Sequence, residues 1–234
     1  MRLPQPLHKG RLLKRYNRFL ADIAFEDGQT ATVHCPNPGS MMSVAVPDAP
    51  VWASISDNPK RKLKHTWELI EIDGALVGIN TNNPNKIGEE GIAAGVIEEL
   101  AGYDSLRREV KYGVEKSRID ILLEDAAKPP CYVEIKNVHL MREKGLAEFP
   151  DSVTSRGAKH LRELAKIVAN GGRAVMLYIV QRPDCKAFAL AEDLDPGYAA
   201  ALKEAKAAGV ETLCYDCDIT VEAITLRKAL PFAA

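Results

Sequence analysis

Hydrophobic and polar positions change their pattern near residue 82 of this 234-residue chain. Before that point, short apolar stretches at 19–28, 51–56 and 67–80 are interrupted by Gly, Pro, Asn and Asp. Interrupted stretches of this length are typical of short strands, so they predict a small all-β barrel with little or no helix. The segment 34–42, HCPNPGSMM, contains two prolines and a glycine and predicts a loop.

Helix and strand patterns alternate after residue 82, where apolar residues recur first at near-helical and then at strand-like spacing. The predicted elements are a helix at 87–100, strands at 108–113, 118–125 and 131–138, a helix at 154–168, a strand at 173–181, a helix at 195–208 and a strand at 210–215. The order α-β-β-β-α-β-α-β indicates a mixed α/β fold. We therefore expect two domains, at 1–82 and 83–234.

Composition limits the class of protein. With 46% hydrophobic and 27% charged residues and no apolar run of 18 or more, the chain is predicted to be globular and to have no membrane partner. The basic, proline-containing N-terminus lacks the apolar core of a signal peptide. Five cysteines at irregular spacings indicate reduced thiols. These features predict a cytoplasmic protein, and none of them indicates an oligomeric state.

Positive charge is clustered in the first third of the chain, although the formal net charge is only -1. One basic cluster precedes the first acid, Asp22, and a second surrounds residue 61. Phosphate recognition needs such a patch but does not follow from one, so DNA binding stands beside a solvated basic face as an interpretation. The residues predicted to contact DNA here are Arg11, Lys14, Arg15, Arg18, Lys60, Arg61 and Lys62.

Two predicted strands carry the candidate catalytic residues. Side chains two residues apart share a face of a strand, so Asp120 projects away from the apolar row that begins at Ile119, and Glu134 lies beside Lys136. The 13 residues between the two acids suffice for a hairpin, which would let both carboxylates converge. Carboxylate oxygens select Mg²⁺ or Mn²⁺, so Asp120 and Glu134 are predicted metal ligands. Lys136 would stabilise charge on a scissile phosphate or orient water, although a solvated ion pair is the common role of such a motif.

Two predicted helices are expected to add residues to this site. In the helix at 154–168, Arg156, Lys159 and His160 share one face at i, i+3 and i+4 and could hold substrate phosphates. An ordinary amphipathic helix with solvent-facing bases is the alternative. Glu89, one turn into the first helix, is a further candidate metal ligand, although an acid at such a position more often faces solvent.

The combination of D…E-x-K on consecutive strands with flanking helices resembles the restriction-endonuclease-like core of the PD-(D/E)xK superfamily. Longer strings, among them RYNRFLAD, SDNPKRK, GINTNNPN and FPDSVTSRGAKHLREL, resemble the sugar fermentation stimulation protein family. That resemblance implies an N-terminal OB-like β-barrel, a C-terminal PD-(D/E)xK domain, DNA as partner and a link to the use of sugars, particularly maltose. By motif, SRID supplies Asp120, and VEIKN supplies Glu134 and Lys136.

An OB-like barrel implies one further candidate. Such barrels bind nucleic acid by stacking bases on aromatic rings in a basic groove, so Trp67, beside the second basic cluster, is predicted to contact DNA. Most aromatic residues of a small barrel belong to its core, which is the alternative for this residue.

Two classes of function follow. The intact D…E-x-K arrangement favours a metal-dependent nuclease, because a protein that only binds DNA has no evident need for two acids near the phosphates. The resemblance to the family favours a non-catalytic DNA-binding protein, such as a transcriptional regulator of sugar metabolism. Enzymatic activity therefore stays open at this point.

Overall fold

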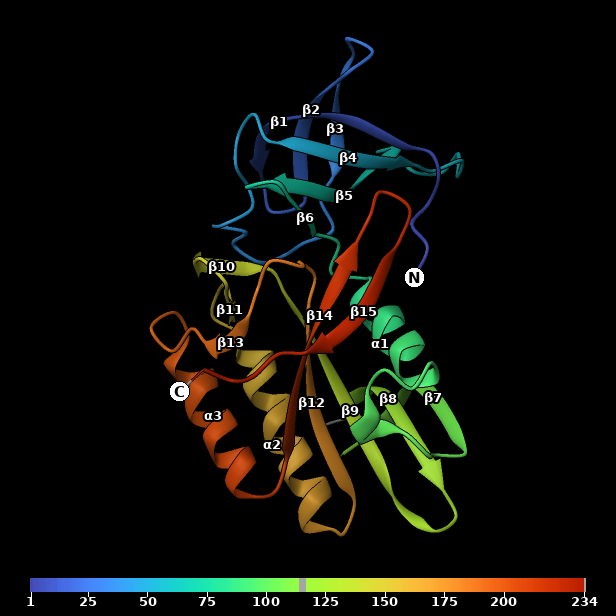
Figure 1. Cartoon of the computed structure of the whole chain (residues 1–234), viewed down its shortest axis with the longest axis vertical. Helices are drawn as coiled ribbons and strands as arrows, with labels where there is room; N and C mark the ends of the chain where they lie inside the picture. The colour runs from blue at the N-terminus through green and yellow to red at the C-terminus, as the bar shows by residue number, and fades with distance from the viewer. Residues whose placement is uncertain (114–116, 234) are drawn as a thin grey trace.

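The computed structural model describes residues 1–113 and 117–233, which form a barrel stacked on an α/β domain along the long axis of the molecule (Figure 1). The barrel strands are β1 (Leu7–Tyr16), β2 (Leu20–Phe25), β3 (Thr30–His34), β4 (Pro50–Ile55), β5 (His65–Ile72) and β6 (Ala75–Gly78). They pair in the order β3-β2-β1-β4-β5-β6, and β3 also pairs with β5 through His34 and Thr66. That extra pairing closes the sheet, and the predicted all-β barrel is confirmed.

The barrel core is formed by the inward-facing residues of its strands. Alternation along β1 and β2 buries Leu12 and Ile23 completely. Trp67 on β5 is also fully buried in this core, and its indole Nε1 donates a hydrogen bond of 2.9 Å to the carbonyl of Leu69. A fully buried ring offers no face to a nucleobase. The prediction that Trp67 contacts DNA is therefore wrong.

The second domain is built on a six-stranded sheet in the order β15-β14-β12-β9-β8-β7. Its strands are β7 (Ser105–Tyr112), β8 (Ser117–Asp125), β9 (Lys128–Val138), β12 (Arg173–Val180), β14 (Glu211–Ile219) and β15 (Ile224–Ala229). Strands β9, β12 and β14 are parallel neighbours, and β8 is antiparallel to both β7 and β9. The predicted hairpin between the two candidate acids is therefore present.

Helices cover both faces of this sheet (Figure 1). They are α1 (Pro84–Ala93), α2 (Ser155–Ala169) and α3 (Pro196–Ala207). Helix α1 packs against one face, in the core that contains Ile121 and Val133, while α2 and α3 enclose the other. Every residue from Ala174 to Val180 of β12 is buried, as a central strand covered on both faces requires.

A smaller sheet lies beside the C-terminal end of β9. It contains β10 (Leu140–Glu143), β11 (Leu146–Phe149) and β13 (Ala187–Leu190). The sequence patterns predicted neither these strands nor β15. The three strands of the smaller sheet have four residues each, too few to show a period. The second and third predicted helices are confirmed within one residue at each end.

The first predicted helix is shorter than expected, because α1 ends at Ala93 rather than at residue 100. Gly95 adopts φ +70°, and the amides of Gly95 and Val96 donate to the carbonyls of Ile92 and Gly91. This pair of hydrogen bonds is the Schellman motif, which terminates a helix. A separate 3-10 turn at Glu98–Leu100 keeps the later apolar residues in the same core. No helix in the described ranges is long and apolar enough to cross a bilayer.

Candidate active site and interdomain cavity

The two predicted acids lie on neighbouring strands, Asp120 on β8 and Glu134 on β9. Asp120 is held by two hydrogen bonds: its Oδ2 accepts from the backbone N–H of Ile135 at 2.7 Å, and its Oδ1 accepts from Nδ2 of Asn85 at 2.8 Å. Asn85 belongs to the first turn of α1. These contacts orient the carboxylate and tie the start of α1 to the site. The pattern of the sequence did not predict the role of Asn85.

Glu134 is nearly inaccessible, with only 2% of its surface exposed. Its Oε1 accepts a hydrogen bond of 2.7 Å from Nζ of Lys136 and contacts Nδ1 of His160 on α2. Its Oε2 is buried and has no hydrogen-bond partner among the described residues. A buried carboxylate oxygen without a partner is costly, so this atom is the natural place for a cation.

The pKa values of the two acids are shifted in opposite directions. Burial raises the pKa of Asp120 to about 6, and the negative charge of Glu134 adds to the effect. Burial also acts to raise the pKa of Glu134, but Lys136 and His160 outweigh it and leave that pKa below its ordinary value. Glu134 is therefore ionised near neutral pH, while Asp120 loses its proton only near pH 6. This is the behaviour of carboxylates that share a site.

The residues at this site fit a hard divalent cation, which two carboxylates would hold and which would satisfy Oε2 of Glu134. No group of three or more His, Cys, Asp and Glu residues in the described ranges could hold a metal on its own. Further ligands would have to be backbone, water or substrate oxygens. The prediction that Glu89 is a third ligand finds no support, because its Oε2 pairs with Nη1 of Arg108 at 3.1 Å.

The faces of β8 differ from the predicted alternation. Ile119 and Leu122 both lie in the core beneath α2, whereas Ile121 lies in the core beneath α1. The strand therefore does not alternate regularly through Asp120. Ile119 and Ile121 pair with Val110 and Arg108 on β7. Glu109 lies between these two partners and has φ +54°. The neighbouring strand is therefore irregular at the same level of the sheet.

Helix α2 contributes to the site differently from the prediction. His160 is 5% exposed and contacts Glu134, so it does not face solvent as a phosphate contact would. Arg156 is exposed, and its Nε lies 3.4 Å from Nε2 of His160. Lys159 is half-buried. The three basic residues therefore do not share one role: His160 contacts an acid, whereas Arg156 stays exposed. Tertiary packing decides which residues of a helix face are covered.

Two buried polar residues near the site were not predicted. Glu163 on α2 is 1% exposed and accepts a hydrogen bond of 2.7 Å from Lys166, while its Oε2 has no hydrogen-bond partner in the described part of the chain. The hydroxyl of Tyr112 is likewise buried without such a partner. Burial, together with the charges of Glu134 and Glu163, raises the pKa of Tyr112 above its usual range. The sequence contained one signal for Glu163: it follows His160 by three residues and therefore lies on the same face of the helix.

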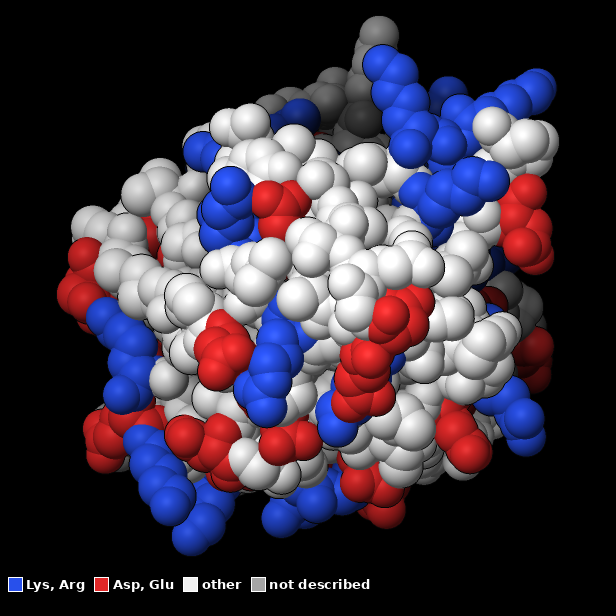
Figure 2. All heavy atoms as spheres, turned by 90° about the horizontal axis from the view of Figure 1, so that it is seen from above, with Lys and Arg blue, Asp and Glu red and all other residues white. Residues whose placement is uncertain are grey.

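The residues of the barrel that were predicted to contact DNA differ in whether their side chains already have partners within the protein. Figure 2, which looks onto the barrel end, shows lysine and arginine side chains gathered near one edge. Lys60 and Lys62 are exposed and form no side-chain hydrogen bond or ion pair with a described residue. Arg61 donates a hydrogen bond of 2.8 Å to Oγ1 of Thr66. The second basic cluster therefore offers at least two lysines to a ligand.

The first basic cluster is more strongly engaged within the barrel. Arg11 lies 3.6 Å from a carboxylate oxygen of Asp48, and Lys14 lies 3.5 Å from one of Asp22. Arg15 donates three hydrogen bonds of 2.8 to 3.1 Å to carbonyl groups of residues 37–40. Arg15 therefore holds the predicted loop in place.

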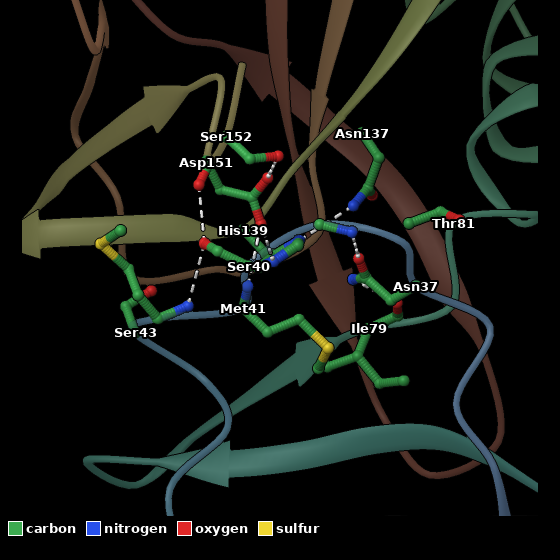
Figure 3. Close-up of polar contacts among 12 residues, drawn as sticks. Asn37, Ser40, Met41, Ser43, Ile79, Thr81, Asn137, His139, Asp151 and Ser152 are labelled. Carbon is green, nitrogen blue, oxygen red and sulfur yellow. Dashed lines mark hydrogen bonds and ion pairs between the residues drawn. The ribbon is translucent and has the colours of Figure 1, made fainter. Parts of the chain in front are cut away.

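That loop joins the barrel to the second domain, as Figure 3 shows. Ser40 Oγ donates to the backbone carbonyl of Asp151 at 2.6 Å, and the amide of Met41 donates to Asp151 Oδ2 at 3.0 Å. A side chain at Gly39 would collide with the same carboxylate, so only glycine allows this approach. Burial acts to raise the pKa of Asp151, but hydrogen bonds and the charge of His139 lower it to about 2.

A solvent-open cavity of about 620 Å³ lies between this loop and the second domain. Its barrel wall includes Arg15, Arg18 and the loop, and its opposite wall includes His139 and Thr154. His139 follows the end of β9, the strand that carries Glu134 and Lys136. Thr154 is the N-cap of α2, the helix that carries His160. The cavity is therefore connected to the carboxylate pair through two elements of structure.

Comparison with known families matches both parts of the chain. Residues 82–223 match the model described as "Sugar fermentation stimulation protein RE domain", and residues 13–79 match "SfsA N-terminal OB domain". The second match agrees with the closed barrel, so the predicted OB-like fold is confirmed.

Curated relatives match along the whole chain. A "Sugar fermentation stimulation protein homolog" of Maricaulis maris is 56% identical over 230 residues, covering 98% of this chain and 97% of the relative. The homolog of Rhodospirillum centenum is 56% identical over 234 residues, covering 100% of both chains.

One solved structure resembles the chain closely. It is described as "The structure of Pyrococcus Furiosus SfsA in complex with Ca2+", with a TM-score of 0.88 and 28% sequence identity. The match covers 100% of this chain and 98% of the archaeal chain.

Proposed function

The chain belongs to the sugar fermentation stimulation protein family, and from this premise we propose that it binds DNA and hydrolyses phosphodiester bonds with Mg²⁺ or Mn²⁺. Asp120 and Glu134 would hold the ion. The observation that carries the proposal is Oε2 of Glu134, which is buried and has no hydrogen-bond partner among the described residues. Asp120 supplies a second carboxylate, whose pKa is raised by burial and by the charge of Glu134. The Ca²⁺ named for the archaeal relative supports a divalent-ion site in this family. Ca²⁺ prefers the same oxygen ligands.

The protein's own residues have distinct tasks in this reaction. When bound, the metal would polarise the phosphodiester and lower the pKa of a water molecule. Asp120 is kept in orientation by Asn85 and by the amide of Ile135. The ammonium of Lys136, with 16% of its side chain exposed, can turn from Glu134 to the charge that develops on the phosphate.

DNA binding is proposed to rest on cations that are accessible. Lys60 and Lys62 on the barrel, with Arg61 between them, and Arg156 on α2 are the best placed. An OB barrel joined to a nuclease-like domain supports a nucleic-acid partner. All five cysteines are free and buried, which supports a reducing, cytoplasmic compartment.

The test is incubation of purified protein with single-stranded, duplex and branched DNA, in Mg²⁺, in Mn²⁺ and in chelator. We expect metal-dependent products that Asp120→Asn abolishes. Asp104→Asn is the matched control, because Asp104 is an exposed acid with no ion pair to a described residue. If the wild type binds metal and DNA but produces no cleavage on any substrate, the chain is a non-catalytic DNA-binding protein, and the nuclease proposal is wrong.

A further inference from the structure

The barrel wall of the interdomain cavity carries an arginine whose side chain has no interaction partner among the described residues. Arg18 lies in the turn between β1 and β2, is exposed, and makes no hydrogen bond or ion pair with a described residue. Beside it in the lining, Arg15 uses its Nη atoms to hold the loop, but its Nε is buried and has no partner in the described ranges. Arg18 is therefore the guanidinium of this wall whose donors remain accessible to a ligand.

The backbone at Arg18 also requires an explanation. Its φ is +59°, in the left-handed region that favours glycine, and Asn17 before it has φ +48°. Asparagine is tolerated in this region, but a long arginine side chain gives the turn no advantage. A residue kept at an unfavourable backbone angle is a reason to look for a role of its side chain.

The opposite wall presents further donors. His139 is 4% exposed; its Nε2 lies 3.5 Å from Asp151 Oδ2, an ion pair when the imidazole is protonated, and forms no hydrogen bond with a described residue. Thr154 caps the 15-residue helix α2, so the positive end of the helix dipole lies at this wall. The helix N-terminus, which faces Arg18 across the cavity, favours an anion.

The carboxylates of the cavity are already engaged. Asp151 accepts hydrogen bonds from the amide of Met41 and from Ser152 Oγ. Glu148 accepts two side-chain hydrogen bonds, of 2.6 and 2.9 Å, from Arg142. Arg142 compensates the charge of Glu148, and His139, when protonated, compensates that of Asp151, so the donors of Arg18 remain for a ligand.

We propose that this cavity binds a phosphate group of the DNA strand on which the carboxylate site acts. His139 follows Lys136 by three residues, which corresponds to about 10 Å along an extended chain. A duplex strand rises about 3.4 Å per nucleotide along its axis, so the cavity would take a phosphate within a few nucleotides of the scissile one. The identity of the strand as substrate rests on the proposed function, whereas the preference for phosphate rests on the cavity itself.

Binding in chelator tests the proposal without any cleavage. Short fluorescent single strands with a 5′-phosphate, with a 3′-phosphate or with neither are titrated with wild type, Arg18→Gln and Arg162→Gln. Arg162 is the matched control, because it is exposed on α2, lies outside the cavity lining and has no ion pair to a described residue. We expect Arg18→Gln to weaken binding about tenfold or more and to reduce the slope of log affinity against log salt by about 0.7. Arg162→Gln should change neither quantity by more than about twofold.

The outcomes separate the sources of phosphate. A tenfold loss confined to strands with one terminal phosphate assigns the cavity to a strand end, and an equal loss for all strands assigns it to an internal phosphodiester. Either supports the proposal. Equal losses in Arg18→Gln and Arg162→Gln, or no loss in Arg18→Gln, would overturn it. Calorimetric binding of inorganic phosphate that Arg18→Gln removes, with strand affinity unchanged, would also overturn it in favour of a small-anion site.

A second variant guards against misfolding. Arg18→Gly places glycine at φ +59°, where it is favoured, so it cannot fail through backbone strain. It should lose strand affinity as Arg18→Gln does. The result is also independent of hydrolysis. If Arg18→Gln loses affinity and no cleavage is ever found, the cavity proposal stands and the nuclease proposal fails. If cleavage is found and Arg18→Gln binds as the wild type does, the cavity proposal alone fails.

Discussion

Replacing Asp120 by asparagine should stabilise the metal-free protein above pH 6. In the folded chain, burial and the charge of Glu134 raise the pKa of Asp120 from 3.8 to about 6. The folded state therefore binds a proton between about pH 4 and 6 that the unfolded state has released, so stability falls as pH rises through this window. Above it, the ionised Asp120 costs the folded state about 3 kcal/mol.

Asparagine has the shape of aspartate without its charge. Its Oδ1 can still accept from the amide of Ile135, and Asn85 can rotate its amide to accept from the new NH₂ group. If that rotation fails, one hydrogen bond is lost, at a cost of roughly 1 to 2 kcal/mol. The expected net gain is therefore about 1 to 3 kcal/mol at pH 8 and none below pH 4. A gain of 1 kcal/mol corresponds to about 2 to 4 °C in a chain of this length.

The assay is urea and thermal unfolding in chelator at one-unit steps from pH 4 to 8, with Asp104→Asn as control. Adding Mg²⁺, Mn²⁺ or Ca²⁺ should reverse the order of stability, because an ion that binds only the folded wild type stabilises it. That gain should diminish below pH 6, where a proton competes for Asp120. If Asp120→Asn is less stable than wild type at pH 8 in chelator, or if ions raise both melting temperatures equally, the two carboxylates do not share a site.

Three further predictions concern catalysis, DNA affinity and the domain interface. Lys136→Met should lower turnover by a large factor and leave DNA affinity nearly unchanged in gel-shift titrations, because an interaction made mainly in the transition state contributes little to ground-state binding. Replacing residues 60–62 by glutamine should reduce the salt slope of single-strand binding by up to about 2, measured by fluorescence anisotropy. Gly39→Ala should lower the free energy of unfolding in urea by about 1 to 3 kcal/mol, because its methyl group collides with Asp151. Gly197→Ala, which meets no atom closer than 3.4 Å, is its control.

Much of the second domain could be predicted from the sequence because its long elements have clear periods. The continuous apolar run of β12 and the capped ends of α2 and α3 carry their signals locally. The pairing of β8 with β9 followed from a connection short enough for a hairpin. The end of α1 was missed because the apolar residues after Gly95 keep a near-helical spacing while belonging to a separate turn.

The surroundings of the candidate site were predicted less well, because they depend on contacts between distant segments. The helical pattern presents His160 as one of three bases on a solvent face, yet packing of α2 on the sheet places it against Glu134. Trp67 stands beside basic residues in the sequence but is buried in the barrel core on β5. Asn85 precedes Asp120 by 35 residues and meets it only because α1 starts beside β8. A local pattern specifies a residue's face and not its partner.

Whether a basic residue already has a partner within the protein determines how many positive charges are available to DNA. Arg15 and Lys60 are both members of basic clusters, but the guanidinium of Arg15 is bound to three carbonyl groups, whereas Lys60 has no side-chain partner among the described residues. Each phosphate contact adds a fixed increment to the salt slope only if the cation is free to make it. A slope calculated from all predicted contacts would therefore be too steep, and the cations without internal partners, Arg18, Lys60 and Lys62, should account for most of the barrel's share.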